Sequence, residues 1–446
     1  MSVLRTMAAF VTGASTASLP GSQRATQHRH VADTFLATVA GSRTSEGRAL
    51  RNLLPRTCVA DAAGMLAAVT RHTEIDDIHL RSCTTPSSVT VPTALALARE
   101  AGEFDPDQVG SAIWIGTELM TRLGMAIDGP RVLYRGLWPT YFAAPFAAAA
   151  IAARIWRLSE EATAHALSLA LMLGAGRSGR FQGRVPGRSV ILALAVASGV
   201  RAAAAARDGV GGDPDLLDGP WLRDAQGLDS DTTALTTNPR EGDDSIYAAL
   251  SLKPFCSAKQ AIAAVEALTQ LIDAGVPPDA ITRVRVRVPP PFVRMISTKA
   301  EPGVRSSTIV SAPFQMGLAA FCRPRLYDIE RAGATADARV AEFSRNVEIV
   351  GDDALLDGFP ACWPAEVEVT AGGSVSRKRV DVAFGDPERP LDEGQLRDKA
   401  QRVLGQLGEA RPGSGAALIE LGLRALQDKD ACRAMADTMW QACAVP

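Results

Sequence analysis

Apolar residues follow a helical period over the first half of this chain. Between residues 31 and 207 they recur every three to four positions or fill alanine-rich stretches, as expected for helices packed by other helices on several sides. The predicted helices are Val31–Ala40, Leu66–Arg71, Val89–Glu103, Ser111–Leu123, Tyr141–Leu158, Ser159–Leu173 and Ser189–Arg207. This half is therefore predicted to be all-helical, after about thirty loosely ordered residues that include His28 and His30.

The period changes after Lys253. One more amphipathic helix is followed by segments in which apolar and polar residues alternate, which is the pattern of half-exposed strands. The predicted elements are the helix Gln260–Ala274, the strands Arg283–Val288, Val347–Val350, Ala365–Thr370 and Ser376–Ala383, and a hairpin turn at Ala371–Ser374. Helical spacing then returns at Asp392–Leu407 and Ala416–Cys443.

These patterns predict a mainly α fold with an inserted α+β lid. Residues 1–256 and 388–446 would form one discontinuous helical domain, and residues 257–387 would form the lid. The length of 446 residues agrees with two domains, because one hydrophobic core rarely serves so long a chain.

Composition narrows the class of protein. Hydrophobic residues make up 47% of the chain and charged residues 22%, which is ordinary for a soluble globular protein. The net charge of −2 and the lack of a long basic run argue against nucleic acid or a membrane surface as the main partner. Seven cysteines show no CxxC pair and no metal-ligand spacing, which indicates free thiols in a reducing compartment. We therefore expect a cytoplasmic protein without a membrane span.

The segment Glu74–His79 concentrates candidate chemistry. It holds three carboxylates and one of only five histidines, just ahead of Pro86-Ser87-Ser88 and a long apolar helix. Carboxylates beside a histidine at a helix start can bind a polar ligand or transfer protons. The alternative interpretation is an acidic loop in which Ser87 or Ser88 caps the helix.

A second candidate segment runs from Gly174 to Arg188. It places Arg177, Arg180, Arg184 and Arg188 among glycines, which makes a continuous helix improbable. Backbone amides and guanidinium groups in such a loop could hold an anion, and an exposed basic turn is the alternative.

Other polar residues flank these segments. Arg135 and Tyr141 lie on either side of Trp138 and could reach the rim of a pocket, although buried core positions are the commoner fate of tyrosines. Lys259 would either contact a substrate or cap a helix. Cys83 has no partner that identifies it as a nucleophile, so we interpret it as structural.

The ordered set of landmarks resembles the MmgE/PrpD family, which includes 2-methylcitrate dehydratases, cis-aconitate decarboxylases and iminodisuccinate epimerases. The segments similar to it are Asp33–Gly41, Glu74–His79 with Thr85–Ser87, Gly116–Gly124, Gly136–Thr140, Lys253–Phe255 and Gly385–Pro387. The resemblance implies a helical domain, an inserted lid, an active site between them and a homodimer. It also implies no metal or organic cofactor, and chemistry that begins by removing a proton next to a carboxylate.

Several polar positions of the family differ in this chain. Thr85, Trp138, Ile191 and Ile262 stand where the resemblance leads us to expect histidines, and Arg188 stands where it leads us to expect a lysine. An arginine can bind a carboxylate but does not shuttle protons, because its pKa is above about 12. The other changes remove groups that titrate near neutral pH and add apolar surface. These substitutions predict a substrate bulkier and more apolar than methylcitrate.

The resulting hypothesis is a lyase, either a dehydratase or a decarboxylase, acting on a small-molecule carboxylate. Lys253 and Arg188 would hold carboxylate or enolate charge, His79 would carry the proton, and Asp77 would orient His79. The remaining substrate-binding residues are predicted to be Asp76, Thr85, Arg135, Trp138, Tyr141, Arg184 and Lys259. Two alternatives stay open: an isomerase, epimerase or cyclase acting on a hydrophobic metabolite, and a non-catalytic binding protein.

Overall fold

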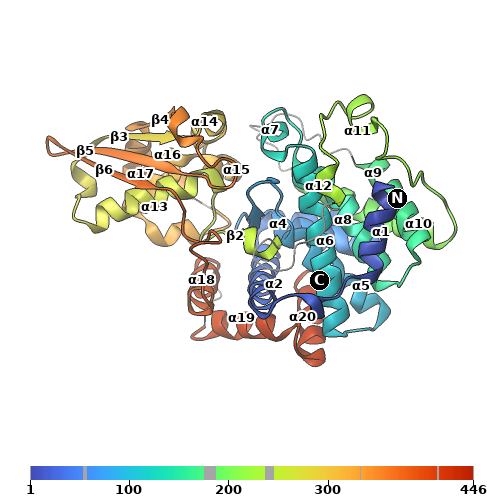
Figure 1. Ribbon diagram of the computed structural model, residues 1–446. Coiled ribbons are helices and arrows are strands. Elements are labelled where there is room, and N and C mark those ends of the chain that lie inside the picture. Colours follow the sequence, from blue (N-terminus) through green and yellow to red (C-terminus); the bar gives the residue numbers. More distant parts are fainter. Residues whose placement is uncertain are drawn as a thin grey trace.

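The computed structural model describes residues 2–53, 58–174, 187–236, 246–331, 333–408 and 411–444. In these ranges the chain is mainly helical, with a two-stranded sheet of β1 and β2 and a four-stranded sheet of order β4-β3-β5-β6. Figure 1 shows the four-stranded sheet and its helices on one side of the molecule and the helical bundle on the other. The predicted fold class, mainly α with an α+β lid, is confirmed.

The bundle is built around α8 (Pro139–Ile155), which is almost wholly buried. It packs against α5 (Ser87–Ala101), α6 (Pro106–Ala126), α9 (Glu160–Leu173) and α10 (Gly187–Arg207), and α10 also packs against α4 (Val59–Arg71). Small residues allow these close contacts: a Cβ on Gly199 of α10 would lie 2.1 Å from the Pro145 carbonyl oxygen of α8. Shorter helices around the bundle are α3 (Ser45–Leu53), α7 (Gly129–Leu133), α11 (Trp221–Asp224) and α12 (Thr233–Thr236).

The described residues at the N-terminus are largely helical and packed on the bundle, so the prediction of a loose N-terminus is wrong. Helix α1 (Val3–Gly13) buries Leu4, Met7 and Val11 on one face, and α2 (Gly21–Gly41) is mostly buried from Val31 onward. Leu4, Met7 and Val11 follow the spacing of one helix face, so the signal was present in the sequence.

The lid sheet has one covered face and one charged face. Its strands are β3 (Ile281–Val288), β4 (Val347–Gly351), β5 (Ala365–Ala371) and β6 (Ser374–Val380). The buried valines of β3 and β5 form the covered face, where α13 (Lys259–Asp273) contacts β5 and β6. On the opposite face arginines and glutamates pair across strands, as in Arg283 with Glu348 and Arg377 with Glu368. The remaining lid helices are α14 (Pro290–Ile296), α15 (Arg305–Val310), α16 (Ala312–Phe321) and α17 (Ala338–Arg345).

The end of the chain returns to the helical domain. Helices α18 (Glu393–Gln406), α19 (Ser414–Arg424) and α20 (Lys429–Ala442) contact α2, which lies beside them in Figure 1. The stretch predicted as one helix, Ala416–Cys443, is two helices, because Asp428 caps a new start with its side chain. Among the described helices only α10 is long and apolar enough to cross a membrane, and it is packed inside the bundle.

Candidate active site

The acidic segment forms a buried turn between α4 and β1 (Asp77–His79). Glu74 in this turn has a φ of 60°, a left-handed conformation that residues with a side chain adopt rarely. Strand β1 pairs with β2 (Leu250–Leu252), with Asp77 opposite Leu252. This short pairing places Lys253 beside Glu74, which lies 179 positions earlier in the chain.

Two carboxylates and three cations meet at this turn. Lys253 Nζ lies 3.0 Å from Glu74 Oε2 and 3.2 Å from Asp76 Oδ1. Arg71 Nη1 lies 2.8 Å from Glu74 Oε2 and 3.3 Å from Asp76 Oδ1, and Arg188 Nη2 lies 3.0 Å from Glu74 Oε1. The five side chains therefore leave one positive charge in excess, in surroundings where water hardly screens it.

Burial acts differently on the two carboxylates. It would raise the pKa of Glu74, but Arg71, Lys253 and Arg188 hold that pKa well below its ordinary value. For Asp76 burial prevails over Arg71 and Lys253, so its pKa is raised. Asp76 Oδ2 is also buried with no hydrogen-bond partner among the described residues. Asp76 is therefore the carboxylate of this pair that more readily takes up a proton.

Arg71, Glu74, Arg188 and Lys253 form one wall of a small cavity between the helical domain and the lid, whereas Asp76 lies behind them and does not line it. The cavity encloses about 40 Å³, which is room for a few water molecules. Its polar wall holds the ion cluster around Lys253 together with Lys259, Thr85 and Cys83. The apolar side is formed by Ile78, Leu133, Trp138, Ala258, Met295, Ile309 and Val310.

Trp138 lies on the apolar side of the cavity and contacts Arg188 of the charged cluster. Its side chain is nearly buried, the Arg188 guanidinium carbon lies 5.1 Å from the ring centroid, and Tyr141 stacks beneath it with centroids 5.6 Å apart. The indole Nε1 has no hydrogen-bond acceptor in the part of the chain that the structure describes. An occupant of the cavity could supply that acceptor, because indole N–H groups usually find one when buried. Tyr141 itself does not line the cavity.

Lys259 lines the cavity from the first residue of α13. Its ammonium group forms a close ion pair with Asp386, which also accepts a hydrogen bond from Ser251 at 2.7 Å. A backbone hydrogen bond joins the two segments that connect the helical domain with the lid: the Leu252 N–H donates to the Gly385 carbonyl oxygen at 2.8 Å. Gly385 has a φ of 94°, and a Cβ there would lie 2.0 Å from the Leu252 oxygen, so only glycine fits.

Thr85 and Cys83 also line the cavity. Thr85 Oγ1 lies 3.2 Å from Thr140 Oγ1, so a hydroxyl pair stands at the position of the expected histidine. Burial raises the pKa of the Cys83 thiol to about 12, which keeps it protonated at neutral pH. A buried thiol of this kind is inert, in agreement with the structural interpretation from sequence.

His79 is buried but does not line the cavity. Side chains alternate along a strand, so Ile78 faces the cavity while His79 points to the other side of β1. The Ser82 backbone N–H donates to His79 Nδ1 at 3.2 Å, which assigns the ring proton to Nε2. Burial lowers the pKa of His79 to about 4, so the ring is neutral at pH 7. The role of proton carrier expected for His79 stays a prediction.

Asp77 does not orient His79, and that predicted pairing is wrong. Asp77 Oδ2 lies 2.9 Å from His30 Nδ1, and the carboxylate also accepts hydrogen bonds from the backbone N–H and the hydroxyl of Ser87. Ser88 donates instead to the Thr85 carbonyl, and helix α5 begins after Pro86 without a side-chain cap. His30, expected in a loose terminus, is thus a buried partner of the acidic segment.

The other predicted binding residues are placed unevenly. Arg135 is exposed and does not line the cavity, and Arg184 lies outside the described residues together with Arg177 and Arg180.

Arg71 was missed by the sequence analysis. The signal was its position at the end of a helix, three residues before Glu74, where side chains three apart can meet.

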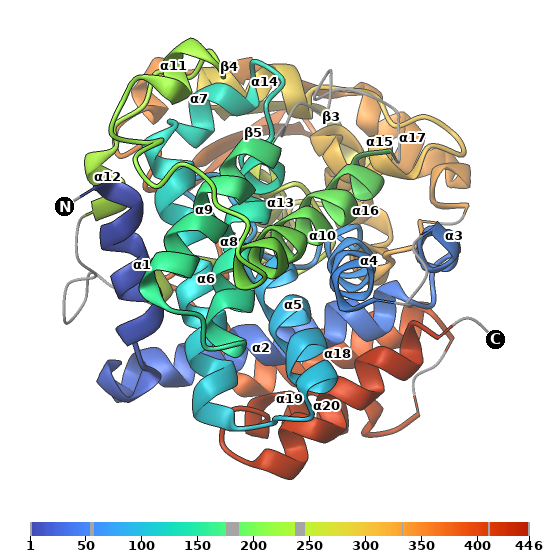
Figure 2. The same ribbon diagram turned by 90° about the vertical axis from the view of Figure 1, so that its right-hand side faces the viewer.

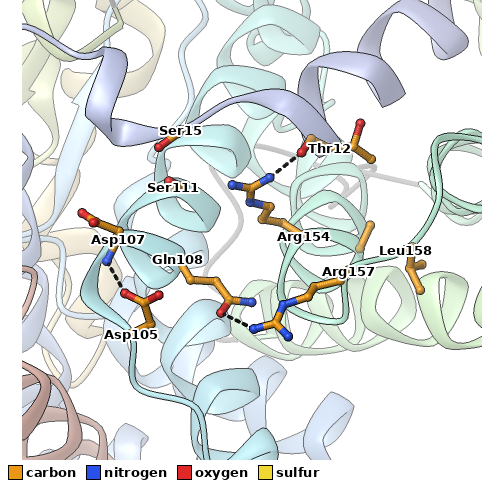
Figure 3. A pocket seen from close by; sticks show the side chains of 10 residues that line it. Thr12, Ser15, Asp105, Asp107, Gln108, Ser111, Arg154, Arg157 and Leu158 are labelled. Carbon is orange, nitrogen blue, oxygen red and sulfur yellow. Dashed lines mark hydrogen bonds between the residues drawn. The ribbon is translucent and has the colours of Figure 1, made fainter.

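A larger outer cleft adjoins the cavity. It encloses about 860 Å³, and Arg188 lines both spaces. Another pocket, of about 460 Å³, lies between α1, α6 and α8, where Arg154 and Arg157 already bind Thr12 and Gln108 (Figure 3). We assign it no function, since none of its described polar side chains is buried without a partner.

Two protein-family models together match most of the chain. The MmgE/PrpD N-terminal domain model matches residues 55–233, and the MmgE/PrpD C-terminal domain model matches residues 255–423. The chain belongs to the MmgE/PrpD family, which includes dehydratases and decarboxylases. A search of curated proteins gave no match. The first domain model ends, and the second begins, on either side of Lys253, where the chain leaves the helical domain.

Proposed function

We propose that this protein is a lyase, a dehydratase or decarboxylase, that acts on a carboxylate with a bulky or apolar part. The observation that supports this most is the placement of Lys253 on the cavity wall. An ammonium group has three N–H donors, and the Glu74 and Asp76 carboxylates accept from Lys253. One donor remains for a substrate carboxylate or for the enolate that forms when its α-proton leaves.

Arg188 would hold a second substrate oxygen. Its side chain is 19% exposed, against 2% for Lys253, so it is the cation of the cluster most open to an incoming anion. Its planar guanidinium group suits a carboxylate. The excess positive charge of the cluster would be neutralised by a substrate carboxylate, which favours binding in a poorly screened site.

Proton transfer would use the Lys253–Asp76 pair. Asp76 has a raised pKa and one unpartnered oxygen, and it contacts the ammonium group that faces the cavity. Lys253 would donate a proton to the reacting atom, or, after passing one of its own protons to Asp76, take the α-proton from the substrate. Such acid–base assistance typically contributes about 10²–10⁴-fold to a rate.

The apolar wall supports a bulky substrate. Trp138, Leu133 and Met295 face the charged cluster across a cavity of about 40 Å³. This volume is far below the roughly 300–1,000 Å³ of a typical ligand site, so the lid must move outward when substrate binds. An isomerase or epimerase remains the alternative, because the same proton removal can end with reprotonation on the other face.

The test compares two substitutions at one position. The purified protein and its Lys253→Met and Lys253→Arg variants are incubated in D₂O with 2-methylcitrate and with 2-alkylcitrates of longer chain. Products are analysed by mass spectrometry, and ligand binding by calorimetry. A lyase product lacks water or carbon dioxide, whereas an epimerase product keeps its composition and gains deuterium.

We expect Lys253→Met to lose binding and turnover, and Lys253→Arg to keep binding while losing turnover, because arginine retains charge but not proton transfer. His79→Ala tests the role that the sequence suggested for that residue. Full turnover in Lys253→Met would reject the proposal. Binding by the unmodified protein without turnover of any of these acids would favour a non-catalytic member of the family.

A further inference from the structure

The outer cleft lies directly outside the cavity, between the two domains. It is lined from the helical domain by α3, the end of α4 and the start of α10. From the lid it is lined by α15 with the preceding Gly303 and Val304, and by Glu330, Arg331, Gly333 and Thr335. Figure 2 shows α3, α4, α10 and α15 in one region of the molecule. Arg188 lines both spaces, so a molecule that passes this side chain can occupy the cavity and the cleft together.

The volume of the cleft fits a small organic ligand. Its 860 Å³ falls within the range of about 300–1,000 Å³ that drug-sized ligands occupy. Ala49 and Leu50 of α3, Val190 of α10 and Val304 of the lid provide an apolar lining. This lining suits an aliphatic chain rather than a densely charged molecule.

One end of the cleft holds a buried cation with no carboxylate partner. Arg331 is 5% exposed, and among the described residues no carboxylate oxygen lies within ion-pair distance of it. It donates instead to the carbonyl oxygens of Arg325 at 2.7 Å and Cys256 at 2.6 Å and to Gln315 Oε1 at 3.3 Å, and its Nε has no hydrogen-bond partner in the described ranges. Buried charges are normally paired, so an uncompensated guanidinium group marks a place for an anion.

The charges that line the cleft sum to zero once Arg188 is left out, because Arg188 already pairs with Glu74. The cleft is lined by three arginines, Arg188, Arg305 and Arg331, and by two glutamates. Both glutamates already have partners: Glu46 accepts from Ser189 and faces Arg305 at 3.6 Å, and Glu330 accepts from the Ser45 backbone at 3.0 Å. None of these groups pairs with Arg331 among the described residues, so a ligand carboxylate would supply its missing anionic partner.

We propose that the outer cleft binds the distal half of the substrate, an aliphatic chain that ends in a second carboxylate held at Arg331 and Arg305. The substrate class is then a long-chain α,ω-dicarboxylate that also carries, near its inner carboxylate, the hydroxyl or carboxyl group that the lyase removes; the inner carboxylate lies at Lys253 and Arg188 and the other in the cleft. This inference rests on the proposed function for the position of the first carboxylate. It adds a second anion site and a chain-binding surface to that site.

The test measures binding of two matched ligand series by calorimetry. One series is saturated α,ω-dicarboxylates from succinate to hexadecanedioate, and the other is the monocarboxylates of equal length. We expect affinity to rise with chain length, by up to about fourfold per buried methylene. Once the chain reaches Arg331, the dicarboxylate should bind about tenfold or more tightly than the monocarboxylate of equal length.

Two variants of α10 separate the cleft from the rest of the protein. Val190→Trp fills the cleft and should reduce binding of the longest dicarboxylate to the level of succinate, while succinate binding is unchanged. Leu194→Trp is the matched control, because Leu194 lies one turn further along α10, is 51% exposed and does not line the cleft. It should leave both series unaffected.

Each outcome decides a different claim. Affinity independent of chain length, equal binding of the two series at every length, or an unchanged length dependence in Val190→Trp would overturn the second site. Loss of succinate binding in Lys253→Met with no chain-length effect would retain the inner site and reject the cleft. A chain-length effect that survives in Lys253→Met would retain the cleft and reject the proposed function.

Discussion

Replacement of Lys399 by Met tests how the acidic turn is held in place. Lys399 of α18 is 2% exposed, and its Nζ lies 2.6 Å from Asp33 Oδ1 and 2.8 Å from the carbonyl oxygen of Ile75. Ile75 lies between the two carboxylates of the ion cluster, Glu74 and Asp76. Lys399 thus connects the last part of the chain, helix α2 and the turn that carries the site.

The expected cost is large. Lys399→Met leaves the Asp33 carboxylate buried without its cation and removes the partner of the Ile75 carbonyl. Breaking a buried ion pair on one side costs about 3–5 kcal/mol, a substantial share of the roughly 5–15 kcal/mol that stabilises a typical protein. Replacing both partners with apolar residues is often neutral, so Lys399→Met with Asp33→Leu should recover most of that loss.

The loss should depend on pH in a defined direction. Burial already raises the pKa of Asp33, with Lys399 opposing it, so removal of Lys399 raises that pKa further. The folded variant therefore holds a proton on Asp33 more tightly than the unfolded chain does. The destabilisation is complete above the folded pKa and shrinks as pH falls toward 3.8, the ordinary value of an aspartate.

Urea unfolding at a series of pH values measures each of these quantities. A loss of less than about 1 kcal/mol in the free energy of unfolding at pH 7 would refute the reasoning, and so would a double variant no more stable than Lys399→Met. A buried carboxylate without its cation must destabilise the protein more than replacement of the whole ion pair by apolar side chains does. A cost that grows on acidification would show that Asp33 is not the group responsible.

Two further predictions concern the ion cluster and the bundle. Glu74→Gln should cost about 3–5 kcal/mol at neutral pH, since buried Lys253 and Arg71 and partly exposed Arg188 lose a shared carboxylate. Because the pKa of Glu74 is depressed, its contribution is complete above pH 4.5 and is lost as pH falls through that depressed pKa, so the acid unfolding curves of the two proteins should converge. Gly199→Ala should cost about 1–3 kcal/mol in urea unfolding because its methyl group meets the Pro145 carbonyl; a loss no larger than that of Ser198→Ala on the same helix would contradict this.

The sequence predicted elements well where periodicity was continuous. The alternation in β3 and β5 separates a valine face from a face of arginines and glutamates, and the structure has the same division. The prediction failed where one continuous pattern covers two helices: Asp428 starts a new helix inside a stretch whose apolar spacing hardly changes.

The site was predicted only in part, for a physical reason. Lys253, Arg188 and Trp138 meet in one cavity as the resemblance implied, but hydrogen-bond partners are set by tertiary contacts that no local pattern encodes. Asp77 binds His30 from another helix rather than His79, two residues away. Adjacent strand positions face opposite sides, so a cluster of polar residues in sequence need not be a cluster in space.

The backbone hydrogen bond between Leu252 and Gly385 determines where the lid can pivot. Both connections to the lid run side by side past Lys253, so a pivot for lid rotation would lie almost at the lysine itself. A swing about that axis displaces the four-stranded sheet, which extends away from the bundle in Figure 1, most and Lys253 least. The ammonium group could then keep its carboxylate partners through every cycle of substrate entry and product escape, while the far rim of the cleft travels.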